Sequence, residues 1–237
     1  MKKSIVSLLF VFLLFIALIF FRAWVVGTDL YASLPAVPRV VLLYILWWVI
    51  LVPICLLMRR DKEKPNDLGF TKDKLFMQVL IGVILGLVTS ITLSVTISLA
   101  GQRQFFYGVS GSIEHLPSAG ALAFSLFEAI ILTGLVEEVV FRGYLYKKMM
   151  DIKNSKWLTI VVTALLFGLM HIVNVLNATE LKDILLGIIS PMVFGFIYGI
   201  CRAYLKNCSL TSLIICHGVH NTLNGVVIFG IIDSLAK

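Results

Sequence analysis

Seven long apolar runs constrain the fold of this 237-residue chain more than any other feature of its sequence. Each run has roughly the 17–25 residues that a helix needs to cross about 30 Å of hydrocarbon. The runs are residues 4–21, 40–58, 75–100, 119–136, 157–173, 184–205 and 210–232. Only 14% of the residues are charged, whereas soluble domains carry about 25%. The sequence therefore predicts an all-α, polytopic membrane bundle of about seven transmembrane helices, with no separate soluble domain.

The basic residues are distributed unevenly over the segments between these runs. With Lys2 and Lys3 on the inner side, seven crossings place 15 of the 20 Lys and Arg residues inside and 5 outside. The positive-inside rule describes such an excess for cytoplasmic segments. We therefore predict a cytoplasmic N-terminus and an outer C-terminus. The net charge of +7 then reflects topology, and we expect the chain to contact the lipid bilayer and no nucleic acid.

Three charged residues follow the end of the fourth run. They are Glu137, Glu138 and Arg142, in the stretch GLVEEVVFRG. A charged residue at the centre of a membrane helix costs roughly 2.5–3.5 kcal/mol, so we expect these residues to pair, to reach the headgroups or to line a wet cavity. Glu138 and Arg142 are four residues apart and can pair on one helix face. Glu137 points about 100° away from that face, which makes it the acid most expected to have a function.

Histidines occur in two other runs. His171 lies in the fifth run, and His217 and His220 lie in the seventh. A single helical histidine is often only a hydrogen-bonded packing residue, but two helices with histidines and a third with acids form a set that can converge. Asn221 shares a helix face with His217, because the two are separated by the i,i+4 spacing.

Glu, His and Asn side chains in a closed bundle suit two chemistries. In the first, Glu137, His171 and His217 hold a divalent metal such as zinc through carboxylate oxygen and imidazole nitrogen. In the second, no metal is used, and Glu137 with His171 activates a water as general base. His217 and Asn221 then stabilise the oxyanion. Both routes lead to the attack of water on an amide.

Three short motifs appear in a fixed order along the chain. They are E-E-x-x-x-R at Glu137, Glu138 and Arg142, F-x-x-x-H at Phe167 and His171, and H-x-x-x-N at His217 and Asn221. In order and spacing they resemble the CAAX-protease and bacteriocin-processing (CPBP, or Abi) family of intramembrane proteases, which is similar to the type II CAAX prenyl endopeptidases. Family members often have Asn where this chain has His220, so a register shifted to His220 and Asn224 stays open.

The resemblance implies an intramembrane endopeptidase that hydrolyses a peptide bond in a membrane-associated peptide or protein. It implies that Glu137 is the catalytic glutamate with Glu138 and Arg142 as structural neighbours, and it leaves a zinc-type and a glutamate-type mechanism open. Residues 119–232 are then the catalytic core, joined to the three helices and outer loop of residues 1–118 in one integrated membrane domain. The short chain looks like bacterial members, multi-pass proteins of the cell membrane linked to bacteriocin immunity, peptide maturation and signalling. No feature indicates an oligomeric state.

Other functions are compatible with parts of the sequence. A non-catalytic immunity or binding protein could use the same scaffold, although such a protein could lose the motif residues freely. Glu128, a further acid in the fourth run, motivates a transporter. A G-x-S-G at residues 108–111 has the spacing of intramembrane serine proteases, but it lies in a loop rich in Gly and Ser. Haem ligation by His171 and His217 would leave Glu137 unexplained.

The predicted helix positions raise a geometrical difficulty for a common site. Counted at about 1.5 Å per residue from the predicted midpoints, Glu137 and His217 fall toward the inner side and His171 toward the outer side. Their axial spread is on the order of 10 Å. A common site therefore requires tilted helices, or helix ends that differ from the predicted ones.

Overall fold

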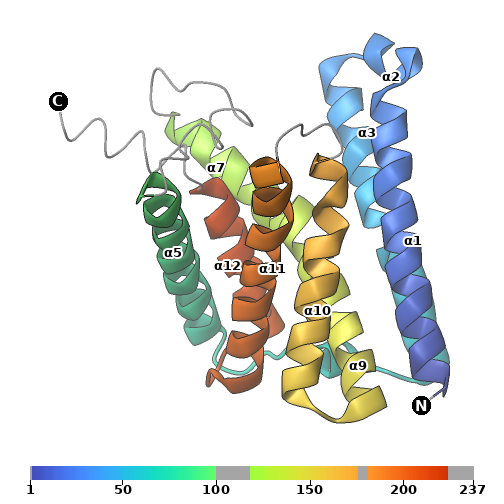
Figure 1. The fold of residues 1–237 in the computed structure, drawn as a ribbon, viewed down its shortest axis with the longest axis vertical. Helices are drawn as coiled ribbons and strands as arrows, with labels where there is room; N and C mark the ends of the chain where they lie inside the picture. Colours follow the sequence, from blue (N-terminus) through green and yellow to red (C-terminus); the bar gives the residue numbers. More distant parts are fainter. Residues whose placement is uncertain (1, 100–117, 176–180, 224–237) are drawn as a thin grey trace. The chain divides into compact units, whose positions relative to one another are not determined.

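The computed structural model describes residues 2–99, 118–175 and 181–223 (Figure 1). Regular structure in these three stretches is entirely helical, with no strand among them. Six helices in the described residues are long and apolar enough to cross a membrane. They are Lys3–Val26, Ala36–Asp61, Leu75–Thr96, Ala119–Lys153, Lys156–Val173 and Ile184–Tyr204. The predicted all-α, polytopic class is therefore confirmed.

The seventh predicted run begins at residue 210, and helix α12 (Leu210–Thr222) begins at the same position. The continuation of that run from residue 224 lies outside the described residues. The same is true of Asn224 and of the G-x-S-G at residues 108–111. A total of seven crossings and a cytoplasmic N-terminus stay predictions.

Several spans are built from consecutive helical segments rather than from one uniform helix. The elements before α12 are α1 (Lys2–Val26), α2 (Asp29–Ser33), α3 (Ala36–Trp48), α4 (Leu51–Asp61), η1 (Pro65–Leu68), α5 (Leu75–Leu99), α7 (Ala119–Phe127), η2 (Glu128–Gly134), α8 (Leu135–Glu138), η3 (Val139–Leu145), α9 (Tyr146–Lys153), α10 (Lys156–Met170), η4 (His171–Val175) and α11 (Leu181–Tyr204). η2 and η3 are π-helical turns, whereas η1 and η4 are 3-10 turns. The fourth span therefore contains two wide turns, one on each side of the motif acids.

Close packing divides the chain into two compact units, each assembled from two separate stretches. The first unit is Met1–Thr71 with Val136–Lys206, and the second is Lys72–Leu135 with Asn207–Lys237. The predicted division into residues 1–118 and 119–232 stays a prediction.

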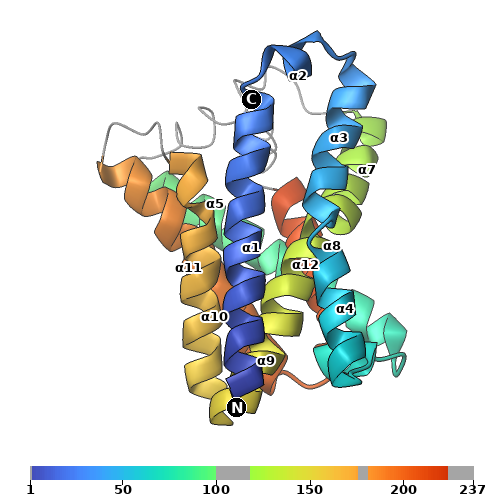
Figure 2. The same ribbon diagram turned by 90° about the vertical axis from the view of Figure 1, so that its right-hand side faces the viewer.

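In the first unit, α1 packs against α3 and α4 and also against α9 and α10. Figure 2 shows α1 running between α10 and the α3–α4 pair. Aromatic rings fill the space between these helices. Phe15 lies 5.0 Å from Trp47 and 5.6 Å from Phe141, and Phe141 lies 5.1 Å from Phe167, all measured between ring centroids. Such pairs each contribute about 0.5–1.5 kcal/mol beyond the burial of their area.

The helix that carries the first motif is longer than predicted. The predicted run ended at residue 136, whereas the span continues to Lys153. It then turns into α10: Asn154 adopts a left-handed conformation (φ 49°), and the Ser155 hydroxyl accepts a hydrogen bond from the Leu158 amide. The run of apolar residues stops at the motif charges, so hydropathy misses the part of the helix beyond them.

The turn between α9 and α10 is a common reference point from which the positions of Glu137 and His171 along their helices can be counted. Glu137 lies 16 residues before Lys153, and His171 lies 15 residues after Lys156. At about 1.5 Å per residue, these separations are about 24 Å and about 22 Å. The two separations are similar, so residue counting no longer requires an axial offset between Glu137 and His171 once the span continues to Lys153.

In the second unit, α12 packs against α5, η2 and α7. Small residues on α5 recur at every fourth position, and they face α12. A Cβ on Gly82 would come within 2.6 Å of the Ser212 carbonyl oxygen, and one on Gly86 within 2.6 Å of the Val219 Cβ. The Ser90 hydroxyl then donates hydrogen bonds to the carbonyls of Gly86 at 2.8 Å and His220 at 3.3 Å. Small residues at this spacing let membrane helices approach closely.

Candidate active site

The predicted site residues are shared between the two units. Glu137, Glu138, Arg142 and His171 lie in the first unit, and the H-x-x-x-N motif lies in the second. In the first unit the acids end α8 and the π-helical turn η3 follows at once. π-helical turns are rare and occur often at functional sites. Every residue from 136 to 146 is buried, so the motif charges do not reach for the headgroups.

Glu138 and Arg142 form a fully buried ion pair. Arg142 Nη1 donates to Glu138 Oε1 at 3.1 Å, and neither side chain is exposed. The predicted pairing on one helix face is therefore confirmed. Because a buried charge without its partner is costly, each of the two residues stabilises the burial of the other.

Phe167 connects the first motif to the second. The Arg142 guanidinium lies 4.0 Å from the centroid of the Phe167 ring and 5.4 Å from that of Tyr198. A Cβ on Gly195 would lie 3.0 Å from Arg142 Nη2, so this glycine of α11 leaves room for the guanidinium. The phenylalanine of F-x-x-x-H is therefore a platform for the arginine of E-E-x-x-x-R, held by a cation–π contact.

His171 ends α10 and begins the 3-10 turn η4. Its Nδ1 lies 2.8 Å from the Phe167 carbonyl oxygen, and the two rings meet edge to face with centroids 5.0 Å apart. Because a carbonyl oxygen can only accept, this hydrogen bond places the proton of a neutral imidazole on Nδ1. The lone pair is then on Nε2, which is the nitrogen able to take a proton or bind a metal.

Glu137 is buried, with 5% of its surface exposed. Its carboxylate interacts electrostatically with Arg22 of α1, whose guanidinium lies 5.1 Å from the centroid of the Trp47 ring. From the sequence, Arg22 was counted among the five basic residues on the outer side and was missed as a neighbour of the motif. The feature that could have identified Arg22 is its position one turn before the end of α1 at Val26. That Glu137 faces His171 stays a prediction.

In the second unit, α12 is short and almost entirely buried. Its N-terminus is fixed by Ser209, which exchanges hydrogen bonds with Ser212 and donates to Gln78 of α5. His217 and His220 are 6% and 9% exposed. Both histidines are therefore held inside the second unit, and the choice between the registers that begin at each of them stays open.

The η2 turn approaches α12 at the level of the first histidine. A Cβ on Gly134 would lie 3.3 Å from the Ile214 carbonyl oxygen and 3.4 Å from His217 Cβ. On the other side of the contact, a Cβ on Gly218 would lie 2.1 Å from a side-chain atom of Ile130. Glycines on both elements therefore set how closely the two can pack. Asn221, one turn after His217, is half-buried.

A metal site was one of the two chemistries expected from the sequence. Within the described stretches, no group of three or more His, Cys, Asp or Glu side chains is placed to hold a metal ion. The predicted ligands are drawn from both units, with Glu137 and His171 in the first and His217 in the second. The bond from His171 Nδ1 to a carbonyl fits a metal ligand, because metal-binding histidines usually donate their other N–H in this way. Zinc stays a prediction.

Comparison with known families matches residues 119–223 to the family described as type II CAAX prenyl endopeptidase Rce1-like. The matched segment contains all three motifs and begins after the first three predicted helices. No curated protein and no solved structure matches the chain. Residues 119–223 of this chain therefore match the Rce1-like family of type II CAAX prenyl endopeptidases.

Proposed function

We propose that this protein is an intramembrane endopeptidase that hydrolyses a peptide bond in a membrane-associated peptide or protein. The Rce1-like family is a protease family, and the six apolar helices indicate a multi-pass membrane protein. The observation that carries the proposal is the joining of two motifs through Phe167. This residue supports the Arg142 guanidinium with its ring and orients His171 with its carbonyl oxygen.

In the proposed mechanism, Glu137 is the general base that takes a proton from water. Its burial and its position directly before Glu138 in the E-E-x-x-x-R motif support this role. His171 accepts a hydrogen bond through Nε2 and helps to orient the water. General base catalysis of this kind typically increases the reaction rate by about 100- to 10,000-fold.

The oxyanion that forms when water attacks needs donors. We assign this role to His217 and Asn221, on one face of α12.

A metal-dependent version uses the same residues. Glu137, His171 and His217 would hold the zinc ion, which as a Lewis acid lowers the pKa of a bound water. The chain's own part is then to supply one carboxylate and two imidazoles and to keep His171 Nδ1 bonded to the Phe167 carbonyl. Only the zinc-type reaction should lose activity on treatment with a chelator. Measuring the metal content and the activity of the same sample therefore distinguishes the two mechanisms.

We further propose that the protein resides in a bacterial cell membrane and acts in peptide maturation, bacteriocin immunity or signalling. These roles follow from the resemblance of the short chain to bacterial members of the CPBP family. The substrate is a peptide or membrane protein that reaches the site from the bilayer. Two alternative functions are a non-catalytic binding protein on the same scaffold and a transporter, the latter suggested by Glu128.

The test is cleavage of a peptide library by purified protein in lipid nanodiscs. Glu137→Gln and His171→Ala should abolish cleavage, and Glu128→Gln should retain it, because Glu128 is half-buried and lies nine residues earlier in the same span. Wild-type cleavage by Glu137→Gln would overturn the proposal. An immunity phenotype that persists in the Glu137→Gln and His171→Ala variants would support the binding protein, and substrate flux that depends on Glu128 would support the transporter.

A further inference from the structure

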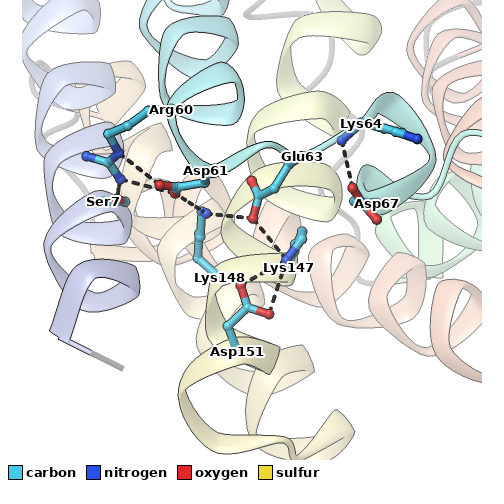
Figure 3. A network of polar contacts seen from close by, with 9 residues as sticks. All are labelled: Ser7, Arg60, Asp61, Glu63, Lys64, Asp67, Lys147, Lys148 and Asp151. Atoms are coloured by element: carbon cyan, nitrogen blue, oxygen red, sulfur yellow. Dashed lines mark hydrogen bonds and ion pairs between the residues drawn. The ribbon is translucent and has the colours of Figure 1, made fainter.

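A network of ion pairs lies where α9 meets the end of α4 and the start of α1 in the first unit, outside the three motifs (Figure 3). Its acids are Asp61, Glu63 and Asp151, and its bases are Arg60, Lys147 and Lys148. Arg60 also donates to the buried Ser7 hydroxyl of α1 at 2.9 Å. The network therefore ties α9 to the end of α4 and to α1.

Lys148 is the buried centre of this network. Its side chain is 2% exposed, and its Nζ lies 2.8 Å from Asp61 Oδ2 and 2.8 Å from Glu63 Oε1. The same ammonium lies 5.2 Å from the centroid of the Tyr144 ring, which is fully buried. Lysine is almost never buried unless it is paired. α9 can therefore occupy this position only while the carboxylates of Asp61 and Glu63 face it.

Lys147 is a natural contrast to Lys148. It is 20% exposed, and it binds Asp151 on its own helix at 2.9 Å as well as Glu63 at 3.0 Å. An i,i+4 pair along one helix contributes only a few tenths of a kcal/mol. Lys148, by contrast, has both of its partners outside α9, so its bonds hold one helix against another.

The position of Lys148 is transmitted directly to the motif. It lies six residues after Arg142 and eleven after Glu137 in one continuous span. The π-helical turn η3 stands between them, with all of its side chains buried. An axial shift at Lys148 therefore moves Glu137 with it, and a misplacement of about 1 Å at a reacting group can cost on the order of 100-fold in rate.

We propose that Lys148 is a positioning residue of this protease: by binding Asp61 and Glu63, it holds the motif helix at the height at which Glu137 acts. The inference rests on the proposed function. Asp61 and Glu63 precede the segment that matches the family, residues 119–223. The N-terminal helices therefore supply part of the support on which the catalytic motif depends.

The first test compares Lys148→Met with Lys147→Met in nanodiscs, at equal amounts of folded protein. We expect Lys148→Met to lower kcat by about 10- to 100-fold with little change in KM, because the loss acts on the reacting group rather than on substrate binding. Lys147→Met should stay close to the wild type. A wild-type kcat for Lys148→Met would overturn the inference.

The second test separates positioning from general stability. In a background without the native cysteines (Cys55, Cys201, Cys208 and Cys216), Lys148→Cys and Asp61→Cys are joined by a reversible bifunctional methanethiosulfonate. The kcat should be low before the tether forms, recover with it and fall again after reduction. A matched tether between Lys147→Cys and Asp151→Cys, within α9, should restore nothing to Lys148→Met.

The outcomes distinguish this inference from the proposed function. A tether that forms between positions 61 and 148 without recovery of kcat overturns the positioning role. If Glu137→Gln is inactive while Lys148→Met cleaves like the wild type, the protease proposal stands and only the positioning role is lost. If Glu137→Gln cleaves like the wild type, the proposed function fails, and the role of Lys148 fails with it.

Discussion

Replacing Arg142 by Met should strongly destabilise the first unit, because it removes the cation that pairs with the buried Glu138 carboxylate. The two side chains are unexposed, and Nη1 lies 3.1 Å from Oε1. At an effective dielectric constant of about 20, two unit charges at this distance attract by about 5 kcal/mol. Measured losses on removing one member of a buried pair are about 3–5 kcal/mol. The lost contact with the Phe167 ring, at 4.0 Å, adds about 2 kcal/mol for a desolvated pair.

The same reasoning ranks the related variants. Glu138→Gln should cost about 3–5 kcal/mol, less than Arg142→Met, because the stacking on Phe167 is retained. The double variant should cost clearly less than the sum, with a coupling energy of about 3 kcal/mol, since neither charge is then left alone. Arg142→Lys keeps the charge but loses the planar fork and the stacked contact, so its cost should be intermediate.

These free energies can be measured by steric trapping in bicelles, with Arg39→Met, at a partly exposed arginine of α3, as the control. Membrane-domain stabilities on the order of 5–15 kcal/mol leave Arg142→Met measurable, and Arg142→Lys covers the case in which the Met variant does not accumulate. Single variants that each cost less than about 1 kcal/mol, or a double variant that equals their sum, would show that this pair does not stabilise the fold as argued.

Three further predictions follow from particular contacts. Gly86→Ala should lower the stability measured by thermal unfolding by about 1–3 kcal/mol, because its Cβ would lie 2.6 Å from Val219 Cβ. The control Gly120→Ala, with open space around it, should be neutral or stabilising. Equal effects of the two variants would contradict the close approach of α5 and α12. Arg22→Gln should lower kcat/KM for peptide cleavage by about tenfold through loss of its attraction to Glu137. Arg39→Gln is the control variant. Unchanged cleavage by Arg22→Gln would show that Arg22 is not part of the site. A cysteine at Lys62 should be labelled by an impermeant reagent from the cytoplasmic side alone; labelling from outside the cell would reverse the predicted topology.

Local rules were sufficient for several features of this protein. The lengths and hydropathy of the apolar runs predicted a polytopic helical bundle, because each residue's transfer free energy into lipid is nearly independent of the rest of the fold. The pairing of Glu138 with Arg142 was also predictable, since the geometry of a helix places residues four apart on the same face. Three motifs in order pointed to the family whose model matches residues 119–223.

Hydropathy failed where charges are neutralised by distant parts of the chain. The predicted fourth run ended at residue 136, although the span continues to Lys153. From the sequence, Lys148 indicates the end of a membrane span. In the structure it is buried, because it pairs with Asp61, which lies 87 positions away in the chain. A scale that counts each residue alone cannot represent a charge whose burial depends on a partner from another helix.

Tertiary structure alone decided how the motif residues of the first unit support one another. Phe167 carries the Arg142 guanidinium, and its carbonyl selects the His171 tautomer, whereas the sequence showed only that Phe167 and His171 are one turn apart. The electrostatic attraction between Arg22 and Glu137 acts between residues 115 positions apart in the chain. Helix periodicity specifies the face on which a side chain lies, but the neighbour that this face meets depends on the packing of the whole unit.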